Sequence, residues 1–213
     1  TFVNDDIRVA NNSEGRDISE NKSHLKVVLS NLSIGHFNKI IHKDINCVIT
    51  GGLTFIRGEN GSGKSTLAQT ITGILPILEG EVSKSKNFCI EYVPNTSFLF
   101  AGTVMENLVI GLDQYDNDKL LELSELVELD ISKDCYVDEV PALSTGQIQK
   151  IKIIRALMNE RAIIIFDEVI SNLSSKIQKK LYDYLKLQDN RIILVIDHNS
   201  PRLKSDKSIN LTS

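Results

Sequence analysis

The chain has 213 residues, which fits one large domain or a domain with subdomains. Apolar residues make up 41% and charged residues 24%, which excludes an intrinsically disordered chain and allows a substantial core. The formal net charge is −4 with no basic block, so nucleic acid is not expected as a partner.

The N-terminal segment, residues 1–24, is rich in Asn, Asp, Ser and Glu, and we interpret it as a polar linker. The chain begins with Thr, so we expect a fragment of a longer polypeptide. No apolar stretch approaches the roughly 18–20 residues that span a bilayer. Cys47 and Cys89 lie in apolar runs without a Cys-x-x-Cys pair, and we interpret them as small core residues of a protein in a reducing compartment.

Short apolar runs begin at Leu25 and predict strands. LKVVLSNLSI, INCVIT and LTFI follow one another at hairpin-like spacing, with Gly51-Gly52 as a turn. A glycine-rich loop comes next, and TLAQTITGIL then predicts a helix that ends near Gly73. The run GEVSKSKNFCIEYV, residues 80–93, has strand character again.

The glycine-rich loop GENGSGKS, residues 58–65, fits G-x-x-x-x-G-K-[ST] at every fixed position and lies between an expected strand and an expected helix. Such a loop points backbone N–H groups at phosphate oxygens. Lys64 can reach the β- and γ-phosphates, and the Ser65 hydroxyl can ligate Mg²⁺. A purely structural glycine turn is the alternative. The chain has neither D-x-x-G nor N-K-x-D, so guanine specificity is not expected.

The second half of the chain alternates helical and strand patterns. The apolar spacing predicts helical structure over residues 103–130. A further helix is predicted with Ile148, Ile151, Ile154 and Leu157 on one face and with Gln149, Lys150 and Lys152 on the others. RAIIIFDE and RIILVIDH predict buried parallel strands, and SINL near the C-terminus predicts a last strand.

Polar side chains follow these two buried strands. Asp167 is suited to hold Mg²⁺, and Glu168 beside it could orient or deprotonate an attacking water. His198 is the second polar group expected at that rim, facing the γ-phosphate. Two acids at a strand end can also be solvated capping groups, and a lone histidine after a strand is usually structural.

The motifs GENGSGKS, LSTGQ at residues 143–147, IIIFDE and His198, in this order and spacing, resemble the nucleotide-binding domain of ATP-binding cassette (ABC) proteins. The resemblance covers the chain from about Leu25, so it implies an ATPase domain over residues 25–213. It implies an α/β fold: a P-loop NTPase (RecA-like) parallel-sheet core with an N-terminal antiparallel β subdomain. An inserted helical subdomain is expected at about residues 103–158.

The resemblance also implies a head-to-tail homodimer, in which the LSTGQ of one copy closes over the γ-phosphate held by the other. Ser144, Thr145, Gly146 and Gln147 would then act in trans. Ser144 offers a hydroxyl and the helix N-terminus favours an anion, while a plain helix cap is the alternative. Thr145 stands where the family usually has glycine, and Ser174 replaces the aspartate of its dimer-contact loop.

Site residues follow from the same resemblance. Catalysis is assigned to Glu168, His198 and Lys64, and metal binding to Ser65, Asp167 and Asn95, the last standing in place of the family's glutamine. The adenine-stacking aromatic would fall at His36 or Phe37. The remaining residues expected to bind ATP are those of the phosphate loop and the residue after it: Gly58, Glu59, Asn60, Gly61, Ser62, Gly63, Lys64, Ser65 and Thr66.

The implied function is that of the ATP-binding and ATP-hydrolysing domain of an ABC transporter, with ATP and Mg²⁺ bound. It would power export of a substrate, a peptide on one interpretation, from the cytoplasmic face of the cell membrane, with transmembrane domains as partners. A soluble ABC-family ATPase and a regulatory nucleotide-binding module remain as alternatives. Glu168 and His198 argue against the regulatory module, which would lack the catalytic base.

Overall fold

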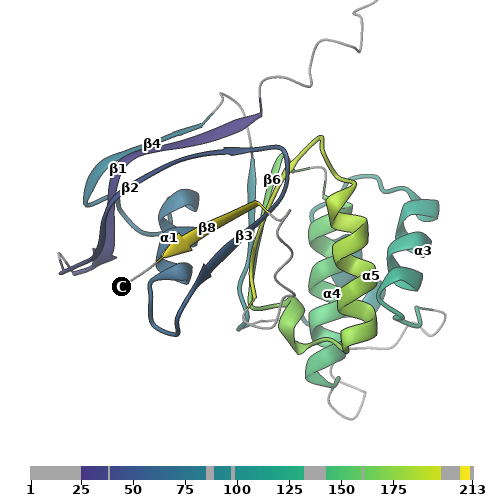
Figure 1. Ribbon diagram of the computed structural model, residues 1–213. Helices are drawn as coiled ribbons and strands as arrows, with labels where there is room; N and C mark the ends of the chain where they lie inside the picture. The colour runs from purple at the N-terminus through teal and green to yellow at the C-terminus, as the bar shows by residue number, and fades with distance from the viewer. Residues whose placement is uncertain are drawn as a thin grey trace, which may run out of the picture.

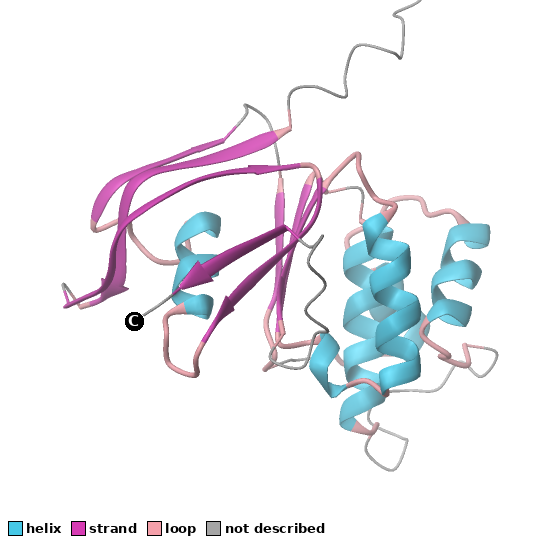
Figure 2. Ribbon diagram, in the orientation of Figure 1, coloured by secondary structure: helices cyan, strands magenta, loops and turns pink. Residues whose placement is uncertain are grey.

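The computed structural model describes residues 25–37, 39–84, 89–96, 99–131, 143–159, 161–197 and 207–211. These residues form two sheets and a group of helices (Figures 1 and 2). The order of the first sheet is β2-β1-β4, and the order of the second is β5-β6-β7-β3-β8. No described helix is long and apolar enough to cross a bilayer. The linker expected over residues 1–24 lies outside the described residues.

The first sheet is antiparallel. Its central strand β1 (Lys26–His36) pairs with β2 (Lys39–Thr50) on one side and with β4 (Glu79–Lys84) on the other. The sequence therefore predicted the β1–β2 hairpin and the antiparallel character correctly. Its expectation of a second hairpin at Gly51-Gly52 is wrong, because the chain leaves this sheet there and enters the other one.

The second sheet is parallel throughout. All residues of β6 and β7 are buried, which confirms the expectation from their continuous apolar runs. The predicted run at residues 80–93 divides between the two sheets, as β4 and β5. The strands are β3 (Gly52–Gly58), β5 (Ile90–Val93), β6 (Ile163–Asp167), β7 (Ile192–Ile196) and β8 (Lys207–Leu211).

Side chains alternate across the parallel sheet and divide the core into two clusters. Ile163 and Ile165 of β6 pack with β1 and the first helix, whereas Ile164 and Phe166 pack with the helices of the opposite face. Figure 1 shows this arrangement, with α1 on one side of the sheet and α4 and α5 on the other. The sheet is thus covered on both faces, as a parallel sheet requires.

The helices begin and end at recognisable signals. α1 ends at Gly73 in the left-handed conformation, and α2 begins with a capping box between Thr103 and Glu106. The helical region expected at 103–130 consists of two short helices, α2 and α3. Both pack on α4. The bounds are α1 (Lys64–Thr72), α2 (Val104–Val109), α3 (Asn117–Leu126), α4 (Thr145–Met158), the 3₁₀ turn η2 (Ile170–Asn172) and α5 (Ser175–Lys186).

Three polar or small residues lie elsewhere than the sequence pattern predicts. Gln149 and Lys152 of α4 were expected on polar faces, but they are buried, with 2% and 6% of their surface exposed. Cys89 was expected in the core, but it is exposed, and Cys47 is half-buried. Helical periodicity alone missed the first two because a loop of the parallel sheet covers that side of α4, as described below.

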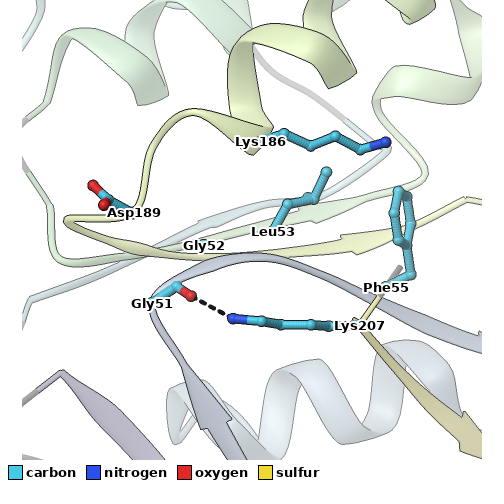
Figure 3. Close-up of a pocket in the computed structure, with 7 residues that line it drawn as sticks. All are labelled: Gly51, Gly52, Leu53, Phe55, Lys186, Asp189 and Lys207. Atoms are coloured by element: carbon cyan, nitrogen blue, oxygen red, sulfur yellow. Dashed lines mark hydrogen bonds between the residues drawn. The ribbon is translucent and has the colours of Figure 1, made fainter. Parts of the chain in front are cut away.

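A hollow of about 260 Å³ lies where β3 begins, at the end of that strand away from Gly58 (Figure 3). Lys207 of β8 crosses this region and donates to the Gly51 carbonyl over 2.8 Å and to the Thr50 hydroxyl over 3.2 Å. The bonds fasten the first residue of β8 to the turn that redirects the chain from one sheet to the other.

Candidate functional site

The phosphate-type loop connects β3 to α1, as the sequence predicts. Gly61 and Gly63 have φ angles of 79° and 86°, a left-handed conformation that glycine adopts without strain. A Cβ atom on Gly63 would also lie 3.2 Å from a methyl carbon of Ile41, so strand β2 approaches the loop closely. The loop therefore needs glycine at both positions for backbone conformation, and at Gly63 for space as well.

Lys64 begins α1 and folds back over this loop. Its Nζ donates to the carbonyl oxygens of Gly58, over 3.0 Å, and Glu59, over 2.7 Å. Burial lowers the pKa of Lys64, while the nearby charges of Glu168 and Asp167 act in the opposite direction. The ammonium group is therefore a poorly hydrated cation, which is available to an anion that enters the loop.

A pocket of about 500 Å³ opens beside the loop. It is formed by the loop with the start of α1, by the β1–β2 hairpin and by the end of β6. His36 of the hairpin is hydrogen-bonded to the Thr66 hydroxyl across 3.0 Å, whereas the neighbouring Phe37 is fully exposed. The lining residues are His36, Ile41, Asn60, Gly61, Gly63, Lys64, Ser65, Thr66 and Glu168.

Asp167, at the end of β6, connects the loop to strand β5. Its Oδ1 accepts a hydrogen bond from the Ser65 hydroxyl over 3.1 Å, and its Oδ2 accepts one from the Tyr92 hydroxyl over 2.7 Å. The Gln69 amide donates to the same Tyr92 oxygen over 3.1 Å. Burial raises the pKa of Tyr92, and its bond to the carboxylate adds to the rise, so the phenol stays a donor.

The Ser65–Asp167 pair fits a Mg²⁺ site. Both side chains offer oxygen, which Mg²⁺ prefers, and the carboxylate is nearly buried, with 6% of its surface exposed. In the described part of the chain, no cluster of three or more His, Cys, Asp or Glu side chains could hold a metal alone. A Mg²⁺ ion here would therefore complete its shell with water and substrate phosphate oxygens, as is usual for this ion.

Glu168 lies in a tight turn directly after β6. Its φ of 57° is unusual for a residue other than glycine. Backbone hydrogen bonds of Glu168 fix the turn at both ends. The Glu168 N–H donates to the Ile196 carbonyl over 3.0 Å, and the Glu168 carbonyl accepts from the Ser171 hydroxyl over 2.7 Å. Strain at a functional position persists when its surroundings hold it in this way, and here it places Glu168 at the pocket. His198, the other residue expected at this rim, lies outside the described residues.

Asn95, the third expected metal ligand, lies in the loop after β5. Like Asp167, it is not among the described residues that line the pocket. Its side-chain oxygen accepts hydrogen bonds from Gln149 of α4, over 3.3 Å, and from Asn172 of η2, over 3.1 Å. The side chain thus joins α4 to the segment that follows Glu168.

Lys152 is the buried cation that holds this loop. It donates to the carbonyl oxygens of Pro94 and Asn95 and to the side chain of Gln149. Burial is the main cause that lowers its pKa to about 8, and repulsion from Arg155 adds to it. The sequence did not predict that Gln149 and Lys152 contact this loop, because a lysine at a helical spacing normally indicates a solvated face.

We expect the pH dependence of stability to reveal this buried charge. A lysine whose pKa is lower in the folded state than in the unfolded state destabilises the fold while it is charged. This cost is relieved as the pH rises from about 8, the pKa in the folded state, to about 10.4, the ordinary pKa of lysine. The unfolding free energy of the wild type, minus that of Lys152→Met, should therefore increase by roughly 2 kcal/mol between pH 7 and pH 10. Urea titrations at each pH measure this difference, and a flat difference would contradict it.

The LSTGQ segment leads into α4. Ser144 caps the helix in a capping box: its hydroxyl accepts from the Gln147 N–H over 3.2 Å, and the Gln147 side chain accepts from the Ser144 N–H over 2.9 Å. Ser144, Thr145 and Gln147 are exposed. None of this segment lines the pocket described above. The plain helix cap is therefore present, and the segment also offers an exposed helix N-terminus.

Comparisons with known proteins agree with this geometry. The family model described as ABC transporter matches residues 42–171. The lactococcin-G-processing and transport ATP-binding protein of Lactococcus lactis is 32% identical, and the match covers 91% of this chain and 31% of that protein. An energy-coupling factor transporter ATP-binding protein of an aster yellows phytoplasma is also 32% identical, over 81% of this chain and 70% of that protein. The chain thus spans about a third of the length of the lactococcin-G-processing relative.

Solved structures show the same fold. A bacterial Atm1-family ABC exporter with ATP bound superimposes with a TM-score of 0.70 at 21% identity, over 83% of this chain and 35% of that chain. A putative ABC transporter ATP-binding protein from Pyrococcus furiosus superimposes with a TM-score of 0.73 at 22% identity, over 87% of this chain and 97% of that chain. The predicted fold class is therefore confirmed. The chain belongs to the ABC transporter family and is an ATP-binding domain of that family.

Proposed function

We propose that this domain binds and hydrolyses ATP with Mg²⁺, within a head-to-tail pair of copies, and so powers export by a longer membrane protein. The observation that carries the proposal is the pocket at the phosphate loop, where Lys64, Ser65 and Glu168 meet beside the buried carboxylate of Asp167. A cation, a metal-suited pair and a candidate general base at one phosphate cradle are the parts that phosphoryl transfer needs.

The chemistry assigns a role to each group. The loop N–H groups and the Lys64 ammonium bind the phosphate oxygens, with Lys64 exchanging its two carbonyl partners for the β- and γ-phosphates. Glu168 accepts a proton from a water whose oxygen attacks the γ-phosphorus, and the bond to the β–γ bridging oxygen breaks. Mg²⁺, held by Ser65 and Asp167, would neutralise charge on the phosphate oxygens. The roles proposed for His198 and Asn95 rest on the family resemblance alone.

Adenine binding is proposed at the β1–β2 hairpin. His36 lines the pocket, while Phe37 is the next residue and is fully exposed at a φ of 48°. Either ring could stack on a base, as the sequence suggested. An exposed phenylalanine is unfavourable in water, and a stacked base would cover it.

We propose a second copy because the LSTGQ turn is not among the described residues that line the phosphate-loop pocket of the same chain. Among the described residues, a Cβ on Gly146 would meet nothing nearer than the Ser144 hydroxyl oxygen, at 3.9 Å. These described neighbours give no steric reason for glycine at this position, whereas close approach of a phosphate does.

Export of a peptide is the finer proposal and rests on relatives. Proteins named for processing and transport of lactococcin G and sublancin 168 match 91% of this chain. By this likeness we propose a peptide exporter that carries its membrane helices in the same longer protein, with this domain at the cytoplasmic membrane face. The coding sequence upstream of Thr1 tests this: six hydrophobic spans support it, and a second phosphate loop overturns it.

ATP-driven dimerisation is the direct test of the shared site. We expect Gly146→Glu to weaken the dimer formed with Mg²⁺ and a non-hydrolysable ATP analogue at least about tenfold, because its carboxylate would face the γ-phosphate. The monomer should remain stable, since acids favour a helix N-terminus. Light scattering measures the dimer. Thr145→Gly, which restores the residue usual in the family, shows in the same assay whether Thr145 tightens or hinders closure.

Asn117→Glu serves as the matched control, because it adds the same charge to the first turn of α3. It should dimerise like the wild type. A Gly146→Glu variant that dimerises normally would show that this turn does not close over the partner's phosphate.

A further inference from the structure

Tyr92 is a tyrosine whose hydroxyl connects two elements of the proposed metal site. It lies on β5 and pairs with Ile165 of β6, two residues before Asp167. The half-buried ring reaches along the sheet, so that its hydroxyl meets Oδ2 of Asp167 at 2.7 Å. That distance is typical of a hydrogen bond from a hydroxyl to a charged carboxylate, which is stronger than a neutral one.

The bond belongs to a closed network with helix α1. Ser65 and Gln69 are four residues apart and share one face of this helix. Ser65 donates to Oδ1 of Asp167, and Gln69 donates to the Tyr92 oxygen, which in turn donates to Oδ2. Both oxygens of the carboxylate are therefore tied to the helix that begins at the phosphate loop.

We infer that Tyr92 is a positioning residue, whose hydroxyl fixes the Asp167 carboxylate so that Oδ1 faces Ser65 at the metal side. The inference rests on the proposed function, because it concerns the Mg²⁺ that the Ser65–Asp167 pair would hold. An aspartate without this partner can rotate its two equivalent oxygens, and Mg²⁺ demands near-ideal octahedral geometry. Partners behind a metal-binding carboxylate commonly contribute a factor of 10–100 to metal affinity.

A role in packing alone makes a different prediction. If Tyr92 only fills the space between β5 and α1, its ring suffices and Phe can replace it. If its hydroxyl positions Asp167, Tyr92→Phe should impair metal binding while nucleotide binding without metal stays intact. The two roles are separable because the phosphate loop and Lys64 do not contact Tyr92 through any described hydrogen bond.

The experiment measures Mn²⁺ binding by electron paramagnetic resonance, with a non-hydrolysable ATP analogue present. We expect the Mn²⁺ dissociation constant of Tyr92→Phe to rise about tenfold. The affinity for the analogue in EDTA should stay within about twofold, which also confirms that the variant is folded. Tyr184→Phe, which removes a hydroxyl from a half-buried tyrosine of α5, should leave both values unchanged.

Gln69→Met provides a second, milder variant. It leaves the Tyr92–Asp167 bond in place and removes only its support, so a rise of about threefold is expected. Unchanged Mn²⁺ affinity in Tyr92→Phe overturns the inference, and if that variant does not fold, unchanged affinity in Gln69→Met does so. Failure of the wild type to bind Mn²⁺ with the analogue is a separate result, which overturns the proposed metal site itself.

Discussion

Glu168→Gln is expected to lower the ATP turnover rate at least about 100-fold, because positioned general bases contribute factors of about 10²–10⁴. Glutamine has the same shape but does not accept the proton. The backbone bonds to Ile196 and Ser171 do not involve the side chain, so the amide should occupy the place of the carboxylate. ATP affinity should therefore change by less than about threefold.

Steady-state hydrolysis and equilibrium binding of ATP measure the two effects separately. The variant should accumulate an ATP-bound dimer, since the pair of copies would close without reopening. Glu125→Gln, an exposed acid of α3, is the control and should hydrolyse ATP like the wild type. Hydrolysis by Glu168→Gln at the parent rate would show that another group accepts the proton.

Lys64→Met is expected to weaken ATP binding about 100-fold, which corresponds to about 2.7 kcal/mol. Hydrogen bonds to charged groups contribute about 1.5–3 kcal/mol each, and the ammonium would make two of them with phosphates in place of its present bonds to carbonyls. Methionine keeps the aliphatic stem and removes the charge. The thermal midpoint should change little, because the lowered pKa of Lys64 indicates that burial already disfavours its charge.

Calorimetric titration with ATP in EDTA measures this loss without any contribution from metal. Lys43→Met, on an exposed position of β2, is the control for a missing positive charge and should bind ATP normally. An affinity loss shared by both variants would indicate a general electrostatic effect rather than a direct contact with phosphate.

Sequence reasoning succeeded where local chemistry decides the structure. The phosphate-type loop, the helix after it and the buried strands follow from glycine positions and continuous apolar runs, which depend on few distant contacts. Asp167 and Glu168 could be expected together because they end one such strand. The pocket at the loop was predictable for the same reason.

Sequence reasoning failed where contacts with a distant segment of the chain determine the structure. Gln149 and Lys152 have the sequence pattern of solvated residues of α4, but the loop at Asn95, more than fifty residues earlier, covers them. The path of β3 depends on partners at the C-terminal half of the chain, so a hairpin was the wrong expectation. Tyr92 resembled any other strand aromatic, because its partner Asp167 lies 75 residues away.

The open surroundings of Gly146 also affect how variants of this protein would be interpreted. A substitution there meets no closely packed neighbour in the part of the chain that the structure describes, so the cellular abundance of the protein should stay near normal. A mutational scan scored by expression or folding would therefore class this position as tolerant. The same scan scored by ATP-driven dimerisation would class it as intolerant under the proposed function, and such a discrepancy identifies residues that act only in the assembled protein.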